Sequence, residues 1–170
     1  MNATALLSVP VGVVVERHQA MSPWLDFVWR PVSILTGVPA ADPWTLLASG
    51  ADRATFYAGP ASIDLYRTET ANYLSNLSSE APCLWVVLRQ CEAEPPYQVV
   101  AVTADPAEGE AYSEAGNDLI DTVPMPPAIA AVIEAFIAEH HIERPFFKRE
   151  RDRSHPAAGG GEKGGGGRQS

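Results

Sequence analysis

Residues 125–153 read MPPAIAAVIEAFIAEHHIERPFFKRERDR, and this stretch decides the predicted fold. Its large apolar residues recur with helical spacing and form one stripe: Ile129, Val132, Ile133, Phe136, Ile137 and His140. Pro126 and Pro127 suit a first helical turn, and Pro145 ends the pattern by Arg144. A helix of about 15 residues is marginal alone. We therefore expect it to dock on the strands that precede it.

The charge of the chain is unevenly distributed. The 170 residues carry a formal net charge of −9. Residues 1–143 hold 5 Arg against 18 Asp or Glu, whereas residues 144–170 hold 7 Lys or Arg against 3 Asp or Glu. A nucleic-acid-binding domain is basic over a whole face, so the acidic body argues against a nucleic-acid partner.

The chain shows no sign of a membrane or a disulfide scaffold. No run reaches the 18 or more apolar residues of a membrane helix, and no Lys or Arg precedes the apolar N-terminal run as in a signal peptide. The two cysteines, Cys83 and Cys91, are too few for a disulfide framework. We expect a cytoplasmic protein with two reduced thiols and no membrane partner.

Short β-branched and alternating runs predict strands over most of the body. They cover residues 9–17, 24–35, 45–48, 54–58, 62–66, 83–90, 97–104 and 118–123. Pro31 is expected to cause a bulge or an edge, and Gly59-Pro60 a turn. Residues 68–77 fit either a helix or a strand, and we favour a continuing strand. The predicted fold is α+β, an antiparallel β-sheet or small β-barrel of about seven to eight strands with two C-terminal helices. It forms one domain, residues 1–153, before a disordered glycine-rich tail, residues 154–170.

The shorter of the two helices is predicted after Asp105. Asp105 is a good N-cap, Pro106 suits the first helical position, and Glu108 is placed to complete a capping box. Gly116 is a C-terminal stop. Six acids lie here without a base: Asp105, Glu108, Glu110, Glu114, Asp118 and Asp121. They form either a solvated face or a docking face for a basic partner or the protein's own tail.

The usual signatures of catalysis and metal binding are missing from the sequence. His140 and His141 are adjacent and point about 100° apart on a helix, so they cannot bind one ion as an i, i+4 pair does. Cys83 and Cys91 lack Cys-x-x-Cys spacing. There is neither a Gly-x-Ser-x-Gly elbow nor a Walker loop. We expect no cofactor, no metal and no catalytic residue.

The basic segment, residues 144–153 (RPFFKRERDR), is the most suggestive feature. An aromatic pair flanked by charge can dock in a partner's groove with an acidic rim. The predicted partner-binding residues are Arg144, Phe146, Phe147, Lys148, Arg149, Arg151 and Arg153. The alternative is that the two Phe fold back on the domain. Glu150 and Asp152 interrupt the run, which argues against RNA binding.

Three groups of stretches carry a resemblance. They are VVVERH with WRPVSIL; LYRTETANYLSNL with CLWVVLRQ; and VTADPAEGEAYSEAGNDLIDTVPMPP with IAEHHIERPFFKRERDR. Over residues 9–153 the chain resembles an uncharacterised bacterial family whose members are typically encoded beside molybdenum- or tungsten-dependent formate dehydrogenases and their maturation factors. The family has no established activity, so no catalytic residue is carried over. The resemblance implies an accessory role near that enzyme.

Three hypotheses of function follow. The leading one is a non-catalytic accessory protein that supports assembly or maturation of formate dehydrogenase through protein–protein contacts. The second is a small-molecule or cofactor-binding β domain, whose cavity would be lined by Trp24, Trp29, Trp44, Tyr66 and Trp85. The third is an enzyme with an unrecognised site around Glu69, with Arg67 and Asn72 nearby.

Overall fold

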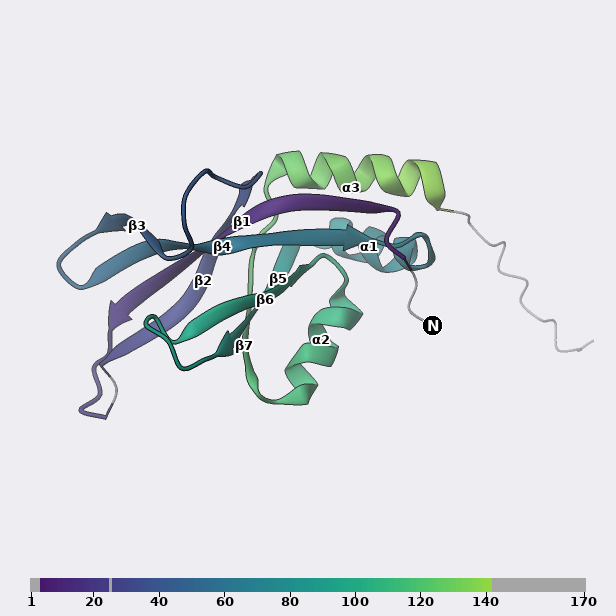
Figure 1. Cartoon of the computed structure of the whole chain (residues 1–170). Helices are drawn as coiled ribbons and strands as arrows, with labels where there is room; N and C mark the ends of the chain where they lie inside the picture. Colours follow the sequence, from purple (N-terminus) through teal and green to yellow (C-terminus); the bar gives the residue numbers. More distant parts are fainter. Residues whose placement is uncertain (1–3, 25, 142–170) are drawn as a thin grey trace, which may run out of the picture.

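The computed structural model describes residues 4–24 and 26–141, and it confirms the α+β class. Within these residues, seven strands and three α-helices follow one another (Figure 1). They are β1 (Leu7–Gln19), β2 (Phe27–Thr36), β3 (Thr45–Ser49), β4 (Arg53–Leu65), α1 (Thr70–Leu77), β5 (Cys83–Gln90), β6 (Tyr97–Thr103), α2 (Pro106–Ala115), β7 (Asp118–Pro124) and α3 (Pro127–His140). A short 3₁₀ turn, η1 (Arg67–Glu69), joins β4 to α1.

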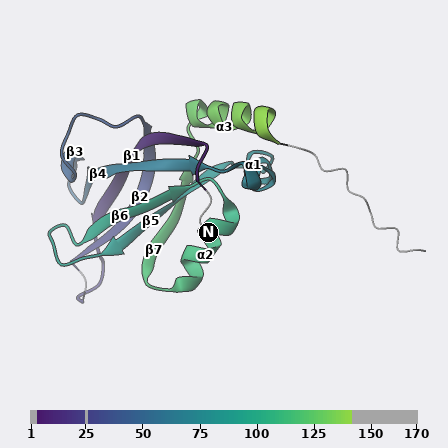
Figure 2. The same cartoon turned by 45° about the vertical axis from the view of Figure 1, so that its right-hand side comes forward.

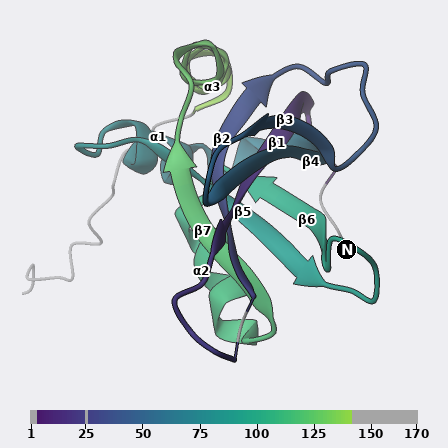
Figure 3. The ribbon, with the colours of Figure 1, turned by 90° about the vertical axis from the view of Figure 1, so that its left-hand side faces the viewer.

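The strands form two antiparallel sheets, in the orders β2-β1-β4-β3 and β6-β5-β7. Viewed from the β3 end, the sheets face each other (Figure 3). Strand β4 lies against β6 and β2 lies against β7, without hydrogen-bonded pairing across either seam. The fold is therefore two sheets around one core, and the predicted alternative of a closed barrel is wrong.

Strand β1 is central because its β-branched residues are buried on both faces. Val11, Val13 and Val15 are fully buried, and Val14 on the opposite face is 6% exposed. Pro31 on β2 lies opposite β1 where the register shifts between Val14 and Val15, and β2 is an edge strand. The bulge or edge predicted at this proline is confirmed, and both occur here, because proline has no N–H to donate to a strand ladder.

The helix predicted from the opening stretch is confirmed as α3. Pro126 is its N-cap and Pro127 its first residue. The buried part of the predicted stripe is Ile129, Ile133, Phe136 and Ile137, all of which belong to the core cluster. The Phe136 ring lies edge-on to Tyr73 of α1, with ring centroids 6.2 Å apart. Figure 2 shows α1 and α3 together at the end of the molecule opposite β3.

Two local predictions are wrong. Residues 68–77 form η1 and helix α1, not a strand. The helix buries Thr70, Tyr73 and Asn76, which are three residues apart and share one face. Gly59-Pro60 is not a turn, because β4 continues through it. Gly59 has φ 143° where the β1–β4 register shifts, so this glycine makes a bulge within the strand.

The N-terminus of α2 has the predicted cap but not the predicted capping box. The Asp105 carboxylate accepts from the backbone N–H of Ala107 at 2.9 Å, and Gly116 ends the helix with φ 82°. The backbone N–H of Asp105 donates to the hydroxyl of Thr103 at 3.0 Å, the role expected of Glu108. Glu108 is thus left on the exposed side of the helix, where it faces a groove.

Candidate functional site

The predicted partner-binding segment lies outside the described residues. Structure is described to His141, and the predicted contacts all follow it: Arg144, Phe146, Phe147, Lys148, Arg149, Arg151 and Arg153. The predicted disordered tail, residues 154–170, lies outside as well. Both remain predictions, and the candidate sites come from the body of the domain.

The first candidate is the hairpin tip, the exposed apolar residues at the connection between β1 and β2. Met21 is 101% exposed and Trp24 88%, and Phe27 and Val28 at the start of β2 are 41% and 37% exposed. The backbone N–H of Trp24 donates to the Ser22 hydroxyl at 3.1 Å, which turns the chain at this point. A largely exposed tryptophan beside a fully exposed methionine is unusual on a surface that contacts only water.

The base of the hairpin tip is held by an aromatic cluster. The guanidinium of Arg17 stacks 4.3 Å from the Phe27 ring centroid and 5.2 Å from that of Phe56. Trp29 packs against Trp44 and Phe56 with centroid distances of 5.8 and 5.9 Å. Stacking of this kind fixes ring orientations. The hairpin tip is thus attached to a packed support.

The aromatic residues proposed to line one cavity are not brought together. Trp24 is exposed, Trp29 and Trp44 pack against each other, and Trp85 packs beneath α2. The Trp85 contact is close, because a Cβ built on Gly109 would lie 2.5 Å from its ring. Of the five residues, Tyr66 alone lines the groove described next.

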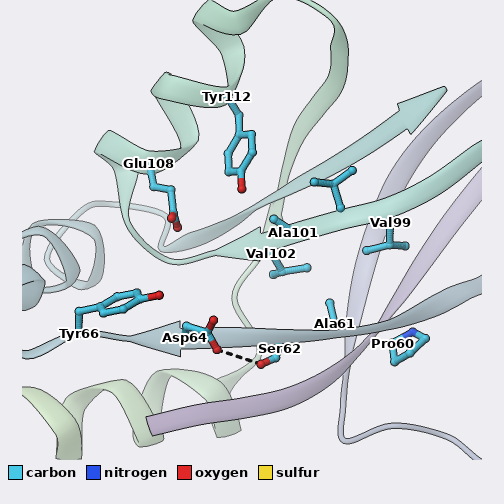
Figure 4. Close-up of a pocket in the computed structure, with 11 residues that line it drawn as sticks. Pro60, Ala61, Ser62, Asp64, Tyr66, Val99, Ala101, Val102, Glu108 and Tyr112 are labelled. Carbon is cyan, nitrogen blue, oxygen red and sulfur yellow. Dashed lines mark hydrogen bonds between the residues drawn. The ribbon is translucent and has the colours of Figure 1, made fainter. Parts of the chain in front are cut away.

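The second candidate is the acidic groove, a hollow of about 290 Å³ over the seam between β4 and β6, flanked by α2. Its polar side chains come from two elements (Figure 4). Strand β4 and the residue after it supply Ser62, Asp64 and Tyr66, and α2 supplies Glu108 and Tyr112. The remaining lining is small and apolar: Pro60, Ala61, Val99, Val100, Ala101 and Val102.

Hydrogen bonds orient one of the two carboxylates in the acidic groove. Oδ1 of Asp64 accepts from the Ser8 hydroxyl at 2.7 Å and from the Ser62 hydroxyl at 3.0 Å. Burial raises the pKa of the Tyr66 phenol, and the Asp64 and Glu108 carboxylates raise it further. The Tyr66 phenol therefore keeps its proton to a higher pH than an ordinary tyrosine.

A polar network beside the acidic groove contains two of the three residues of the enzyme hypothesis, Glu69 and Asn72. The Asn72 amide donates to Glu69 at 3.1 Å and to Asp105 at 3.0 Å, which joins the start of α1 to the start of α2. The Tyr73 hydroxyl accepts from the Tyr66 N–H at 2.8 Å, and burial raises the Tyr73 pKa to about 12. These bonds hold helices and strand ends together. They show no arrangement of nucleophile and base.

The histidines at the end of α3 contact neighbouring side chains. His140 lies 4.6 Å from the Phe136 ring, and His141 Nδ1 lies 2.9 Å from the Thr70 hydroxyl. Cys83 and Cys91 are free thiols. Within residues 4–24 and 26–141, no three His, Cys, Asp or Glu side chains gather as a metal site would need.

Comparison with known families places the chain in one of them. A family model described as "Protein of unknown function (DUF3305)" matches residues 10–151. The chain belongs to this family. No curated protein and no solved structure matches it. The resemblance to an uncharacterised family is thus confirmed.

Three of the six acids between residues 105 and 121 have separate structural settings. Asp105 caps α2, Asp118 pairs with Arg89, and Glu108 lines the acidic groove. As to membranes, the part of the chain with a described structure holds no helix both long and apolar enough to span one.

Proposed function

We propose that this DUF3305 protein is a non-catalytic accessory protein that binds a protein partner through the hairpin tip. The observation that carries the proposal is the exposure of Trp24 and Met21, 88% and 101%, on a connection whose base is packed. Tryptophan is enriched among residues that dominate binding energy at protein interfaces. Burying each of these side chains against a partner would contribute roughly 1.5–3 kcal/mol.

The aromatic cluster at the base of the hairpin tip affects the affinity for a partner as well as the position of the tip. The stacking of Arg17 on Phe27 holds the strands that carry the hairpin tip, so less conformational freedom is lost on binding. An exposed edge strand on the same sheet adds surface: β3 carries Leu46 and Leu47, 52% and 49% exposed. An edge strand with apolar residues can pair with or pack against another chain.

The partner we propose is formate dehydrogenase or one of its maturation factors, in the cytoplasm. The support is the resemblance of residues 9–153 to proteins encoded beside these enzymes. Assembly of such a complex needs no chemistry from the accessory protein. A non-catalytic role agrees with the exposed apolar side chains of the hairpin tip and with polar networks whose hydrogen bonds only hold helix ends in place.

The test is co-purification of the dehydrogenase and its maturation factors with the full-length tagged protein. The variant Met21→Ser/Trp24→Ser is compared with Leu6→Ser/Leu74→Ser, which removes two exposed apolar side chains, 54% and 42% exposed, elsewhere on the domain. We expect the first variant to lose the partner at least about tenfold, the effect of 1.4 kcal/mol, and the second to retain it. Equal recovery with both variants would remove the hairpin tip from the proposal.

The same co-purification also tests the basic segment, with a protein truncated after His141. If this truncation alone abolishes recovery, the contact lies in residues 142–170 and not in the hairpin tip. If deletion of the gene leaves formate dehydrogenase activity unchanged, the accessory role itself fails.

A further inference from the structure

The acidic groove has the chemistry of a site for a cationic side chain. Two carboxylates and two phenols line it, and none of its lining residues is Lys or Arg. Asp64 uses one oxygen, Oδ1, for both serine hydroxyls, and the described residues make no hydrogen bond to Oδ2. A guanidinium or ammonium group would meet an oriented carboxylate on β4 and a second one on α2.

The described chain ends close to this groove. His141 contacts Thr70 at 2.9 Å, which holds the end of α3 beside the start of α1. Thr70 follows Tyr66, at the rim of the groove, by only four residues, a separation of at most about 14 Å. Lys148 lies seven residues beyond His141, and a chain of that length spans up to about 25 Å. The basic segment therefore starts within reach of the acidic groove.

We propose that the basic segment, residues 144–153, binds in the acidic groove of its own domain. The segment is net positive and so complements the groove, because its two acids, Glu150 and Asp152, are outnumbered by five bases: Arg144, Lys148, Arg149, Arg151 and Arg153. Because the segment is tethered, its effective concentration at the groove is in the millimolar range without any partner. A partner that binds the basic segment must first displace it. The groove thus regulates access to the segment, independently of the hairpin tip.

The test is zero-length carbodiimide cross-linking of the full chain, which joins a lysine amine to a carboxylate as an amide while the carbodiimide takes up the water. The chain has two lysines, Lys148 and Lys163, so Lys163 is an internal control on the same tail. We expect monomeric protein in which Lys148 is joined to Glu108 or Asp64. The yield should fall at least about fivefold in 1 M salt, where the Debye length shrinks to about 3 Å.

Two variants change the charge of the segment and leave the reacting groups in place. Arg149→Gln/Arg151→Gln/Arg153→Gln should lower the yield at Lys148, and Glu150→Gln/Asp152→Asn should raise it. Equal labelling of Lys148 and Lys163, or cross-links spread over the exposed acids such as Glu92, would overturn the proposal. A cross-link confined to dimers would also overturn it and would assign the groove to a second copy. None of these outcomes bears on the hairpin tip, so this proposal and the proposed function can fail separately.

Discussion

Replacing Gly109 by alanine tests how α2 is held against the sheet. An added Cβ would lie 2.5 Å from both Cγ and Cδ1 of Trp85 and 2.8 Å from its Cδ2. These atoms are the near end of the indole, so either the whole ring or the helix must move. Overpacking of this kind costs about 3 kcal/mol at its upper end, and the helix propensity of alanine offsets about 1 kcal/mol.

We therefore expect Gly109→Ala to lower the free energy of unfolding by about 2 kcal/mol and Tm by roughly 4–8 °C. Urea denaturation and calorimetry measure the two quantities. Ser113→Ala on an exposed position of the same helix is the control, and it should be neutral or slightly stabilising. In a Trp85→Val background, where the indole is absent, Gly109→Ala should raise the free energy of unfolding by the roughly 1 kcal/mol that alanine's helix propensity contributes. A higher Tm for Gly109→Ala in the native background would refute the packing of α2 on Trp85.

Three further predictions concern polar groups. Asn76→Ala should lower the free energy of unfolding by about 3 kcal/mol, because the Asn76 amide hydrogen-bonds the N–H and C=O of Cys83 and the C=O of Ala104. Urea denaturation measures it, and a loss below about 1 kcal/mol would contradict this. Hydrogen bonding to Arg89 lowers the pKa of Asp118 in the folded state. The stabilisation that the Asp118 carboxylate contributes is therefore complete above the unfolded pKa of about 3.9 and is lost as pH falls through the folded pKa. The difference in free energy of unfolding between the native chain and Asp118→Asn should vanish in acid, and a difference that stays constant with pH would refute this prediction. The Tyr73 pKa of about 12 predicts that stability falls as pH rises from about 10 towards 12, and that Tyr73→Phe flattens this slope.

The sequence predicted the parts of the fold that local patterns determine. The apolar stripe of α3 and the β-branched run of β1 are periodic over many residues, so their burial could be inferred. The cap at Asp105 and the stop at Gly116 depend on backbone geometry within a few residues. The bulge or edge predicted at Pro31 could be inferred because proline has no N–H to donate to a strand ladder.

The parts that could not be predicted depend on contacts between distant residues. Helix α1 is stabilised by Asn76, whose amide hydrogen-bonds backbone groups 7 and 28 residues away. The spacing of apolar residues in the sequence does not predict such bonds. Gly59 makes a bulge because of its partner on β1, and a Gly-Pro pair alone reads as a turn.

The acidic groove was missed for the same reason. Asp64 and Glu108 come from β4 and α2, and they meet only because β4 lies against β6. The exposed hairpin tip carried a weak signal: a tryptophan in a connection rich in turn residues. The second hypothesis placed Trp24 in a cavity lining instead, since tryptophan is usually largely buried.

The most direct test of the central claim is the amount of formate dehydrogenase, or of its maturation factors, that co-purifies with the full-length protein when only the hairpin tip is changed. We expect Met21→Ser/Trp24→Ser to keep an unchanged Tm, because both side chains are almost fully exposed, and to recover at least about tenfold less partner. Full recovery of the partner by a folded Met21→Ser/Trp24→Ser protein would contradict it.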